Sequence, residues 1–150
     1  MKLEPRHQLL FDSDWRFARG DVDGAEAVAF DDADWRRLNL PHDWSIEGPF
    51  SEDAPCGGGG GYLPGGVGWY RKRFTLPDQD RDKRVTIQFD GVYKNCDVWL
   101  NGQRLGFHPG MVQKLGNTFT LIETKSVTTK SKVSEPCLHP YGYTLSLIHI

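Results

Sequence analysis

Residues 66–107 decide the fold class, and they read GVGWYRKRFTLPDQDRDKRVTIQFDGVYKNCDVWLNGQRLGF. Aromatic and β-branched residues dominate four runs in this stretch, and apolar and polar residues alternate most regularly through residues 85–90. Such a period of two is typical of a half-buried strand. Asn101-Gly102 separates the last two runs and favours a two-residue hairpin turn, because both positions need positive φ. The sequence therefore predicts strands at 69–76, 85–90, 96–100 and 104–107.

Successive side chains of the first predicted strand point to opposite faces. Tyr70, Phe74 and Leu76 share one face, and Arg71 and Arg73 share the other. The predicted strands are linked by turns, and no amphipathic helical pattern lies between them. These features predict an all-β fold, an antiparallel β-sandwich, rather than a βαβ unit.

Length and composition exclude several classes of protein. A chain of 150 residues can form one domain with a stable core. The formal net charge is −2, and the arginines are spread along the chain, so nucleic acid is not an expected partner. Cys56, Cys96 and Cys137 are odd in number and lack CxxC spacing, so neither a disulfide framework nor a zinc site is predicted. We expect no metal and no cofactor.

The sequence shows neither a targeting signal nor a membrane span. The first ten residues contain charges and Pro5 and lack an apolar core of signal-peptide length. No run reaches the ~20 apolar residues that cross a bilayer. The sequence predicts no membrane partner and, by default, a cytoplasmic location.

Upstream of the predicted sheet, residues 9–17 predict a first strand with Trp15 and Phe17 facing inward. Residues 38–50 predict an ordered loop, because Pro41 and Pro49 exclude a regular helix. Residues 51–66 include five consecutive glycines, which make the backbone costly to order. Loops of this length are usually mobile or functional.

Three separated motifs carry a family resemblance: LPHDWSIEGPF, YLPGGVGWYRKRF and FDGVYKNCDVWLNGQRLGFHP. In this order and spacing, they resemble the N-terminal sugar-binding domain of glycoside hydrolase family 2, of the β-galactosidase type. The resemblance covers roughly residues 8–109, so we delimit a partial family domain at 1–109. It implies a jelly-roll sandwich, similar to galactose-binding domains, that precedes an immunoglobulin-like domain and a TIM barrel.

The resemblance also implies a function. The expected role is that of a non-catalytic domain in an enzyme that hydrolyses β-galactosides, with β-glucuronidase and β-mannosidase as related options. Family chemistry uses two carboxylates, which lie in the barrel domain, and no stretch of this chain matches the barrel motifs. The resemblance therefore implies no catalytic residue here and contact with carbohydrate only through the longer enzyme, which includes the missing domains.

Two other function classes remain open from the residues alone. A free-standing carbohydrate-binding module fits the sandwich, although an end shortly after Tyr143 leaves the expected final strands out. A purely structural interaction domain explains the fold but none of the three motifs. The downstream reading frame distinguishes these alternatives, because barrel motifs there would support the enzyme.

The sequence after Pro109 departs from the family pattern. YGYT is expected there but occurs only at 141–144, after a second His-Pro pair, so residues 110–140 have the character of an insertion or of an artefactual segment, such as an unspliced intron or a chimera. Their Lys, Thr and Ser content leaves little apolar surface to bury, so we expect the segment to loop out as a disordered stretch or a weakly held hairpin rather than to form a new core. Residues 145–150, LSLIHI, have the character of an adapter-derived tail, for which we expect no structure.

The candidate sites follow from the motifs. In the family, the segment that enters the GWYRK strand overlooks the barrel mouth, so the resemblance implies that Tyr62, Leu63, Pro64, Gly65 and Gly66 shape the sugar site. A flexible linker is the alternative for these five residues. The glycines are not a phosphate cradle, because no Lys-Ser/Thr pair follows them.

The second candidate is a structural motif around His42-Asp43-Trp44, preceded by Pro41. An imidazole beside a carboxylate can perform acid–base chemistry, but adjacent side chains on an extended segment point apart. We therefore predict a loop lock, in which Asp43 caps backbone N–H groups and Trp44 is buried. Trp69 and Trp99 could stack on a sugar, but rings on alternating strands are more often in the core.

Overall fold

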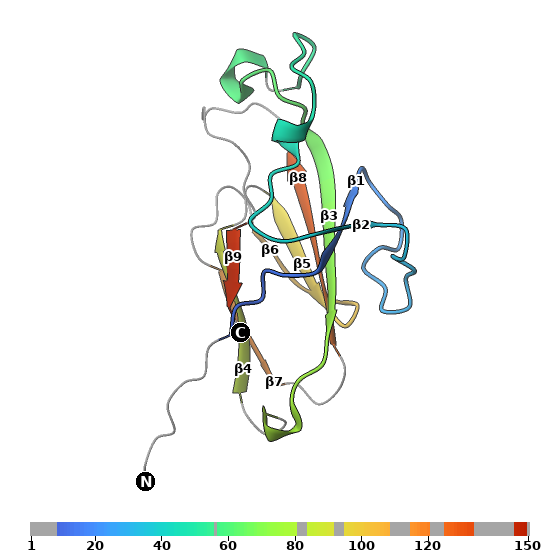
Figure 1. Ribbon diagram of the computed structural model, residues 1–150, viewed down its shortest axis with the longest axis vertical. Helices are drawn as coiled ribbons and strands as arrows, with labels where there is room; N and C mark the ends of the chain where they lie inside the picture. Colours follow the sequence, from blue (N-terminus) through green and yellow to red (C-terminus); the bar gives the residue numbers. More distant parts are fainter. Residues whose placement is uncertain are drawn as a thin grey trace.

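The computed structural model describes residues 9–55, 57–80, 84–91, 95–108, 115–120, 125–133 and 146–149. Two antiparallel sheets make up this part of the chain (Figure 1). One has six strands in the order β2-β1-β3-β8-β5-β6, and the other has three in the order β7-β4-β9. The strands are β1 (Trp15–Arg19), β2 (Arg36–Leu38), β3 (Gly66–Phe74), β4 (Arg84–Gly91), β5 (Cys96–Leu100), β6 (Gln103–His108), β7 (Leu115–Thr120), β8 (Lys125–Val133) and β9 (Ser146–His149).

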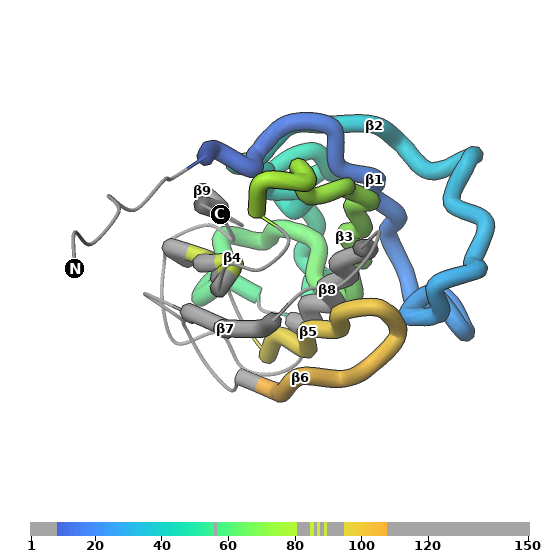
Figure 2. The backbone as a smooth tube through the Cα atoms, turned by 90° about the horizontal axis from the view of Figure 1, so that it is seen from below, coloured from blue at the N-terminus to red at the C-terminus, as the bar shows by residue number. Residues whose placement is uncertain are grey.

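The only helices among the described residues are three short 3₁₀ turns, η1 (Ser45–Glu47), η2 (Gly57–Gly60) and η3 (Asp78–Asp80). None of these is long and apolar enough to cross a membrane. Seen from below, the three-stranded sheet lies against the six-stranded one (Figure 2). The prediction of an all-β antiparallel sandwich is confirmed.

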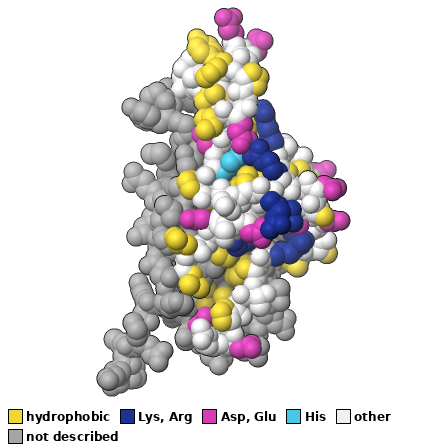
Figure 3. Space-filling model, in the orientation of Figure 1, with side chains coloured by type: hydrophobic (Ala, Val, Ile, Leu, Met, Phe, Trp, Pro, Cys, Tyr) yellow, Lys and Arg dark blue, Asp and Glu magenta, His cyan; other side chains and the backbone are white. Residues whose placement is uncertain are grey.

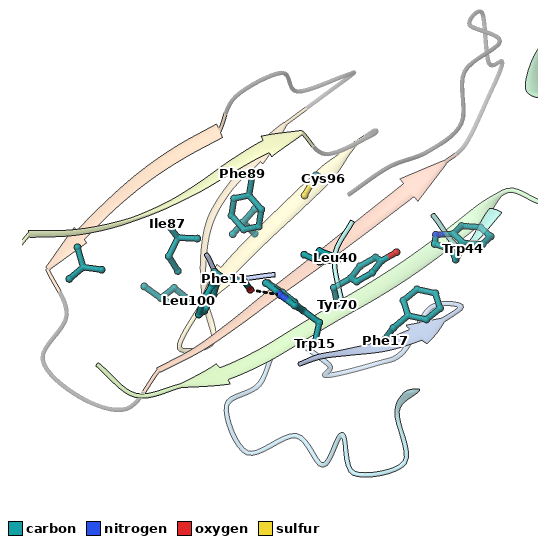
Figure 4. Close-up of a cluster of buried hydrophobic side chains, with 12 residues drawn as sticks. Phe11, Trp15, Phe17, Leu40, Trp44, Tyr70, Ile87, Phe89, Cys96 and Leu100 are labelled. Carbon is teal, nitrogen blue, oxygen red and sulfur yellow. Dashed lines mark hydrogen bonds between the residues drawn. The ribbon is translucent and has the colours of Figure 1, made fainter. Parts of the chain in front are cut away.

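The core lies between the two sheets (Figure 4). It follows the predicted alternation, because alternate residues of three strands are buried: Trp15 and Phe17 in β1, Val85, Ile87 and Phe89 in β4, and Cys96, Val98 and Leu100 in β5. Burying one large apolar side chain stabilises a fold by roughly 1.5–3 kcal/mol. The cluster consists of Phe11, Trp15, Phe17, Leu40, Trp44, Tyr70, Val85, Ile87, Phe89, Cys96, Val98 and Leu100.

A buried ion pair lies on the opposite face of β3. The Arg71 guanidinium donates from Nε to Asp32 Oδ2 at 2.9 Å and also bonds to the carbonyl oxygens of Ala25 and Ala27. Arg73 donates to the second oxygen of Asp32 at 3.0 Å. Because a buried charge is costly unless it is paired, these bonds fix the long connection between β1 and β2 against the sheet.

The two tryptophans predicted to be in the core lie outside the inter-sheet cluster. Trp69 is buried and Trp99 is half-buried, and their rings stack with centroids 5.5 Å apart. The alternation of β3 places Trp69 on the face opposite to Tyr70. Burial of Trp69 thus agrees with the expectation, but the ring packs against Trp99 rather than between the sheets.

The Asn101-Gly102 hairpin forms as predicted, with φ of 51° at Asn101 and 76° at Gly102. It joins β5 to β6, whose register shifts between Val98 and Trp99. β6 begins at Gln103 and ends at His108, so the return strand is slightly longer than the sequence predicted.

The chain after β6 differs from expectation. Residues 110–140 contain β7 and β8, so the predicted looping-out is wrong. β8 pairs with β3 on one side and with β5 on the other, and β7 pairs with β4. β9, in the tail expected to lack structure, also pairs with β4. Residues 141–144 lie outside the described part. A separate origin of the 110–140 segment stays a prediction.

Candidate functional site

The candidate site is the loop of residues 41–66, which connects β2 to β3 and projects beyond the ends of the strands (Figure 1). Its outgoing and returning arms lie side by side. The backbone N–H of Ser51 donates to the carbonyl of Tyr62 at 2.9 Å, and Gly48 lies directly against Pro64, whose ring would be 2.5 Å from an added Cβ. The first part of the loop is thus ordered by its returning arm, and the whole forms a compact closed loop rather than an extended linker.

His42 fixes the start of this loop. The Leu40–Pro41 peptide bond that precedes it is cis. His42 Nδ1 lies 2.8 Å from the hydroxyl oxygen of Tyr70 in β3. On the other side of the ring, Nε2 lies 2.6 Å from Arg36 Nη2 and 3.1 Å from Glu47 Oε1. The imidazole therefore joins β2, η1 and β3 at one point.

Asp43 and Trp44 turn away from His42. Asp43 Oδ1 accepts the backbone N–H of Ser45 at 2.9 Å and its hydroxyl at 2.6 Å, a local turn of the type that Asp favours. Trp44 is buried, and the Arg19 guanidinium lies 4.9 Å from the centroid of its ring. His42 and Asp43 do not converge, so they form no acid–base pair in this geometry.

Gly68 makes room for Trp44. A Cβ at this position would lie 2.7 Å from Trp44 Nε1 and 3.3 Å from Phe17 Cε2. Real Cβ atoms are essentially never that close to another heavy atom. The GVGWY motif therefore allows the indole to lie flat on β3.

The returning arm carries the predicted sugar-site residues. Tyr62 has φ of 57° and is 47% exposed, and its hydroxyl lies close to Gly58 of η2. Leu63, Pro64, Gly65 and Gly66 are all half-buried. The structure brings these five residues together on one arm, but their role in binding sugar stays a prediction.

Large apolar side chains are exposed along the loop. Ile46 is 65% exposed and Phe50 is 76% exposed, both on the outgoing arm. Tyr62, on the returning arm, is 47% exposed. Figure 3 shows hydrophobic side chains over the upper end of the molecule, where the loop projects in Figure 1. We call Ile46, Phe50 and Tyr62 the loop's apolar surface. Exposed apolar residues gathered on an ordered element are typical of an interaction site.

Burial and hydrogen bonding shift two pKa values at the base of the loop. Burial raises the pKa of Tyr70, and the carboxylates of Asp43 and Glu47 add to this shift. The hydrogen bond from Arg36 lowers the pKa of Glu47 below its ordinary value. Tyr70 therefore stays a neutral hydroxyl, and Glu47 stays a carboxylate at neutral pH.

The charged side chains of this region form hydrogen bonds with neighbouring residues. Among the residues that the structure describes, no group of three or more His, Cys, Asp or Glu side chains is arranged to hold a metal ion. Sequence reasoning found His42, Asp43 and Trp44 but missed Arg36, Glu47 and Tyr70 as the partners of His42. No local signal identifies Tyr70, because it is 28 residues from His42 in the sequence.

Comparison with known proteins gives close relatives. A β-galactosidase from Bacteroides ovatus is 53% identical over 107 residues, which cover 71% of this chain and 13% of the relative. A putative β-glucuronidase from Formosa agariphila is 44% identical over 104 residues, which cover 69% of this chain and 10% of the relative. The chain thus spans only about a tenth of the length of the curated relatives that it matches. No family model matches it.

Solved structures agree with these relatives. A β-glycosidase from Bacteroides vulgatus superimposes with a TM-score of 0.89 at 32% identity, over 97% of this chain and 20% of that one. A glycosyl hydrolase family 2 member from Bacteroides cellulosilyticus gives 0.88 at 32% identity, over 95% and 20%. The fold and the matches define a β-sandwich domain of a glycoside hydrolase. The chain belongs to glycoside hydrolase family 2, in which it corresponds to the N-terminal domain.

Proposed function

We propose that this chain is the N-terminal, non-catalytic domain of an enzyme that hydrolyses β-galactosides. The observation that carries the proposal is the 53% identity with the β-galactosidase from Bacteroides ovatus. The β-glucuronidase relative is less similar, at 44%. Galactose and glucuronic acid differ at C6, where a carboxylate replaces the hydroxymethyl group, and in the configuration of the C4 hydroxyl. The galactoside is the substrate class that the higher sequence identity favours.

The domain's part in that reaction is to support and shape the sugar site. In the proposal, the catalytic carboxylates lie in a TIM barrel elsewhere in the enzyme, and the loop of residues 41–66 faces that barrel. Two observations support this orientation. The arms are held to each other and to β3, and the apolar surface on them is exposed in the isolated chain. A preorganised loop costs little ordering entropy when it docks.

The reaction class is tested on the full enzyme encoded by the source reading frame. We expect turnover of an aryl β-galactoside to exceed that of the matched aryl β-glucuronide in kcat/KM. The 150-residue chain alone should hydrolyse neither substrate above a vector control. Preference for the glucuronide would reject the galactoside assignment, and turnover by the chain alone would reject the non-catalytic role.

The orientation of the loop is tested with matched substitutions in the same enzyme. Phe50→Ala removes an exposed ring from the apolar surface, whereas Phe107→Ala removes an exposed ring from β6. We expect Phe50→Ala to lower kcat/KM at least several-fold and Phe107→Ala to leave it within experimental error of the unaltered enzyme. Equal effects of the two substitutions would contradict the proposed orientation.

A further inference from the structure

Three polar atoms meet at the base of the loop, and their distances limit where the protons can be. Arg36 Nη2 lies 2.6 Å from His42 Nε2 and 2.8 Å from Glu47 Oε1. His42 Nε2 lies 3.1 Å from the same Glu47 oxygen. The His42 side chain is 11% exposed, whereas those of Arg36 and Glu47 are 49% and 41% exposed, so the contact lies where the ring meets solvent.

The Arg36 contact assigns a tautomer to the neutral imidazole. Arginine is always a donor, so Nε2 of His42 must accept the bond from Nη2 and cannot carry a proton. The ring proton is then on Nδ1, which donates to the hydroxyl oxygen of Tyr70 at 2.8 Å. The two hydrogens on Arg36 Nη2 suffice for both of its bonds, one to His42 and one to Glu47.

Protonation of the ring is incompatible with this arrangement. An imidazolium has N–H groups on both nitrogens, so Nε2 can no longer accept from Arg36. Two cations cannot stay 2.6 Å apart, whereas the Glu47 carboxylate is already within reach of the new Nε2–H. Tyr70 can accept from Nδ1–H in both states.

We propose that His42 is a proton-dependent link at the base of the loop: the neutral ring accepts a hydrogen bond from Arg36 of β2, and the protonated ring donates to Glu47 of η1 and releases Arg36. The proton comes from solvent, and no covalent bond changes. Acid thus removes the His42–Arg36 bond, while the Arg36–Glu47 ion pair still joins the loop to β2 and Tyr70 still joins the ring to β3. This inference concerns only contacts within the chain and holds whichever glycoside the enzyme hydrolyses.

The groups around the ring are consistent with such a link. Arg36 faces it from β2, Glu47 from η1 and Tyr70 from β3, and the neighbouring Asp43 adds negative charge beside Tyr70. From β1, the apolar ring of Phe17 lies edge-on with centroids 4.9 Å apart. One cation, Arg36, and one carboxylate, Glu47, therefore contact the imidazole at Nε2.

NMR of the imidazole nitrogens in the 150-residue chain tests the assignment directly. At pH values where the ring is neutral, we expect Nδ1 to show the shift of a protonated nitrogen and Nε2 that of an unprotonated one. On acidification, the Arg36 side-chain signals should change with the same midpoint as the His42 signals. A proton on Nε2 in the neutral ring, or Arg36 signals that do not follow His42, would overturn the proposal.

Two substitutions should shift the pH midpoint of the His42 signals in opposite directions. Arg36→Met removes the cation and should move the His42 midpoint to higher pH, whereas Glu47→Gln removes the anion and should move it to lower pH. Arg37→Met is the matched control, because Arg37 is the next residue in β2 but pairs with Asp14. It should leave the midpoint unchanged. The Arg36 and Glu47 side chains are partly exposed, so neither substitution removes a buried group. The NMR assignment of the tautomer uses the unaltered chain. Midpoints that do not change, or that shift in the opposite directions, would contradict the proposal.

Discussion

Gly68→Ala tests whether the indole of Trp44 really lies on β3. The added methyl would lie 2.7 Å from Trp44 Nε1, 3.1 Å from Trp44 Cδ1 and 3.3 Å from Phe17 Cε2. Trp44 is buried between the loop and the strand, so its ring cannot simply rotate into solvent. The methyl must instead displace a packed side chain.

The size of the effect follows from two opposing contributions. Overpacking a filled site costs typically about 1–3 kcal/mol. Replacing glycine within a strand restores roughly 0.5–1 kcal/mol, because glycine loses more conformational freedom on folding. Neither Gly68 nor Gly106 has the positive φ that would add strain. We therefore expect Gly68→Ala to lower the free energy of unfolding by about 1–2 kcal/mol.

Gly106→Ala is the matched control. Gly106 is also in a strand, and a Cβ there would meet nothing within 4 Å. Its substitution should leave stability unchanged or raise it by up to about 1 kcal/mol. Urea denaturation of both variants measures the difference. In a Trp44→Leu background, which gives the methyl room, Gly68→Ala should cost less. If the two alanine variants agree within ~0.5 kcal/mol, the packing of Trp44 on Gly68 is wrong.

Three other outcomes are expected. Asp32→Asn should lower the unfolding free energy by about 3–5 kcal/mol, because it leaves the buried Arg71 charge without its carboxylate. Arg73→Met removes a half-exposed partner of Asp32 and should cost at most about 1 kcal/mol. Equal losses of the two variants in urea denaturation would refute the buried pair. Arg36 lowers the pKa of Glu47, so this carboxylate stabilises the fold at pH values above its ordinary pKa of 4.5, and this stability is lost as the pH falls through the lowered pKa. Glu47→Gln should therefore flatten that part of a stability–pH profile. An unchanged profile would contradict the interaction between Arg36 and Glu47. Deleting residues 125–133 removes the strand between β3 and β5 and should abolish cooperative unfolding; unaltered stability would instead support the looped-out segment that the sequence predicted.

The local part of the fold was predictable from residue patterns. Alternation identified the buried face of β4, and Asn101-Gly102 identified the hairpin, because both depend on neighbours in the chain. Trp15 and Phe17 are buried as predicted. The bounds were less accurate. β3 begins at Gly66, before its aromatic residues, because pairing with β8 extends over the whole strand.

Non-local contacts were not predictable in the same way. Residues 125–133 are rich in Lys, Thr and Ser and offer few apolar side chains, and this composition indicated a looped-out segment. A central strand also depends on backbone hydrogen bonds to its neighbours, which composition does not reveal. The partners of His42 were missed for a related reason. Tyr70 approaches it only because β3 pairs with β1, and Arg36 only because β2 does.

Because the two arms of the loop are hydrogen-bonded to each other, the length of the loop tip and the spacing of β2 and β3 can be considered separately. Residues 52–61 begin and end at points that the Ser51–Tyr62 hydrogen bond holds together, so their length is not tied to the distance between β2 and β3. Lengthening such a segment costs only ~0.6 kcal/mol per doubling. Insertions and substitutions can therefore accumulate at this tip while the β-sandwich beneath keeps its sequence, and the two parts can evolve at different rates.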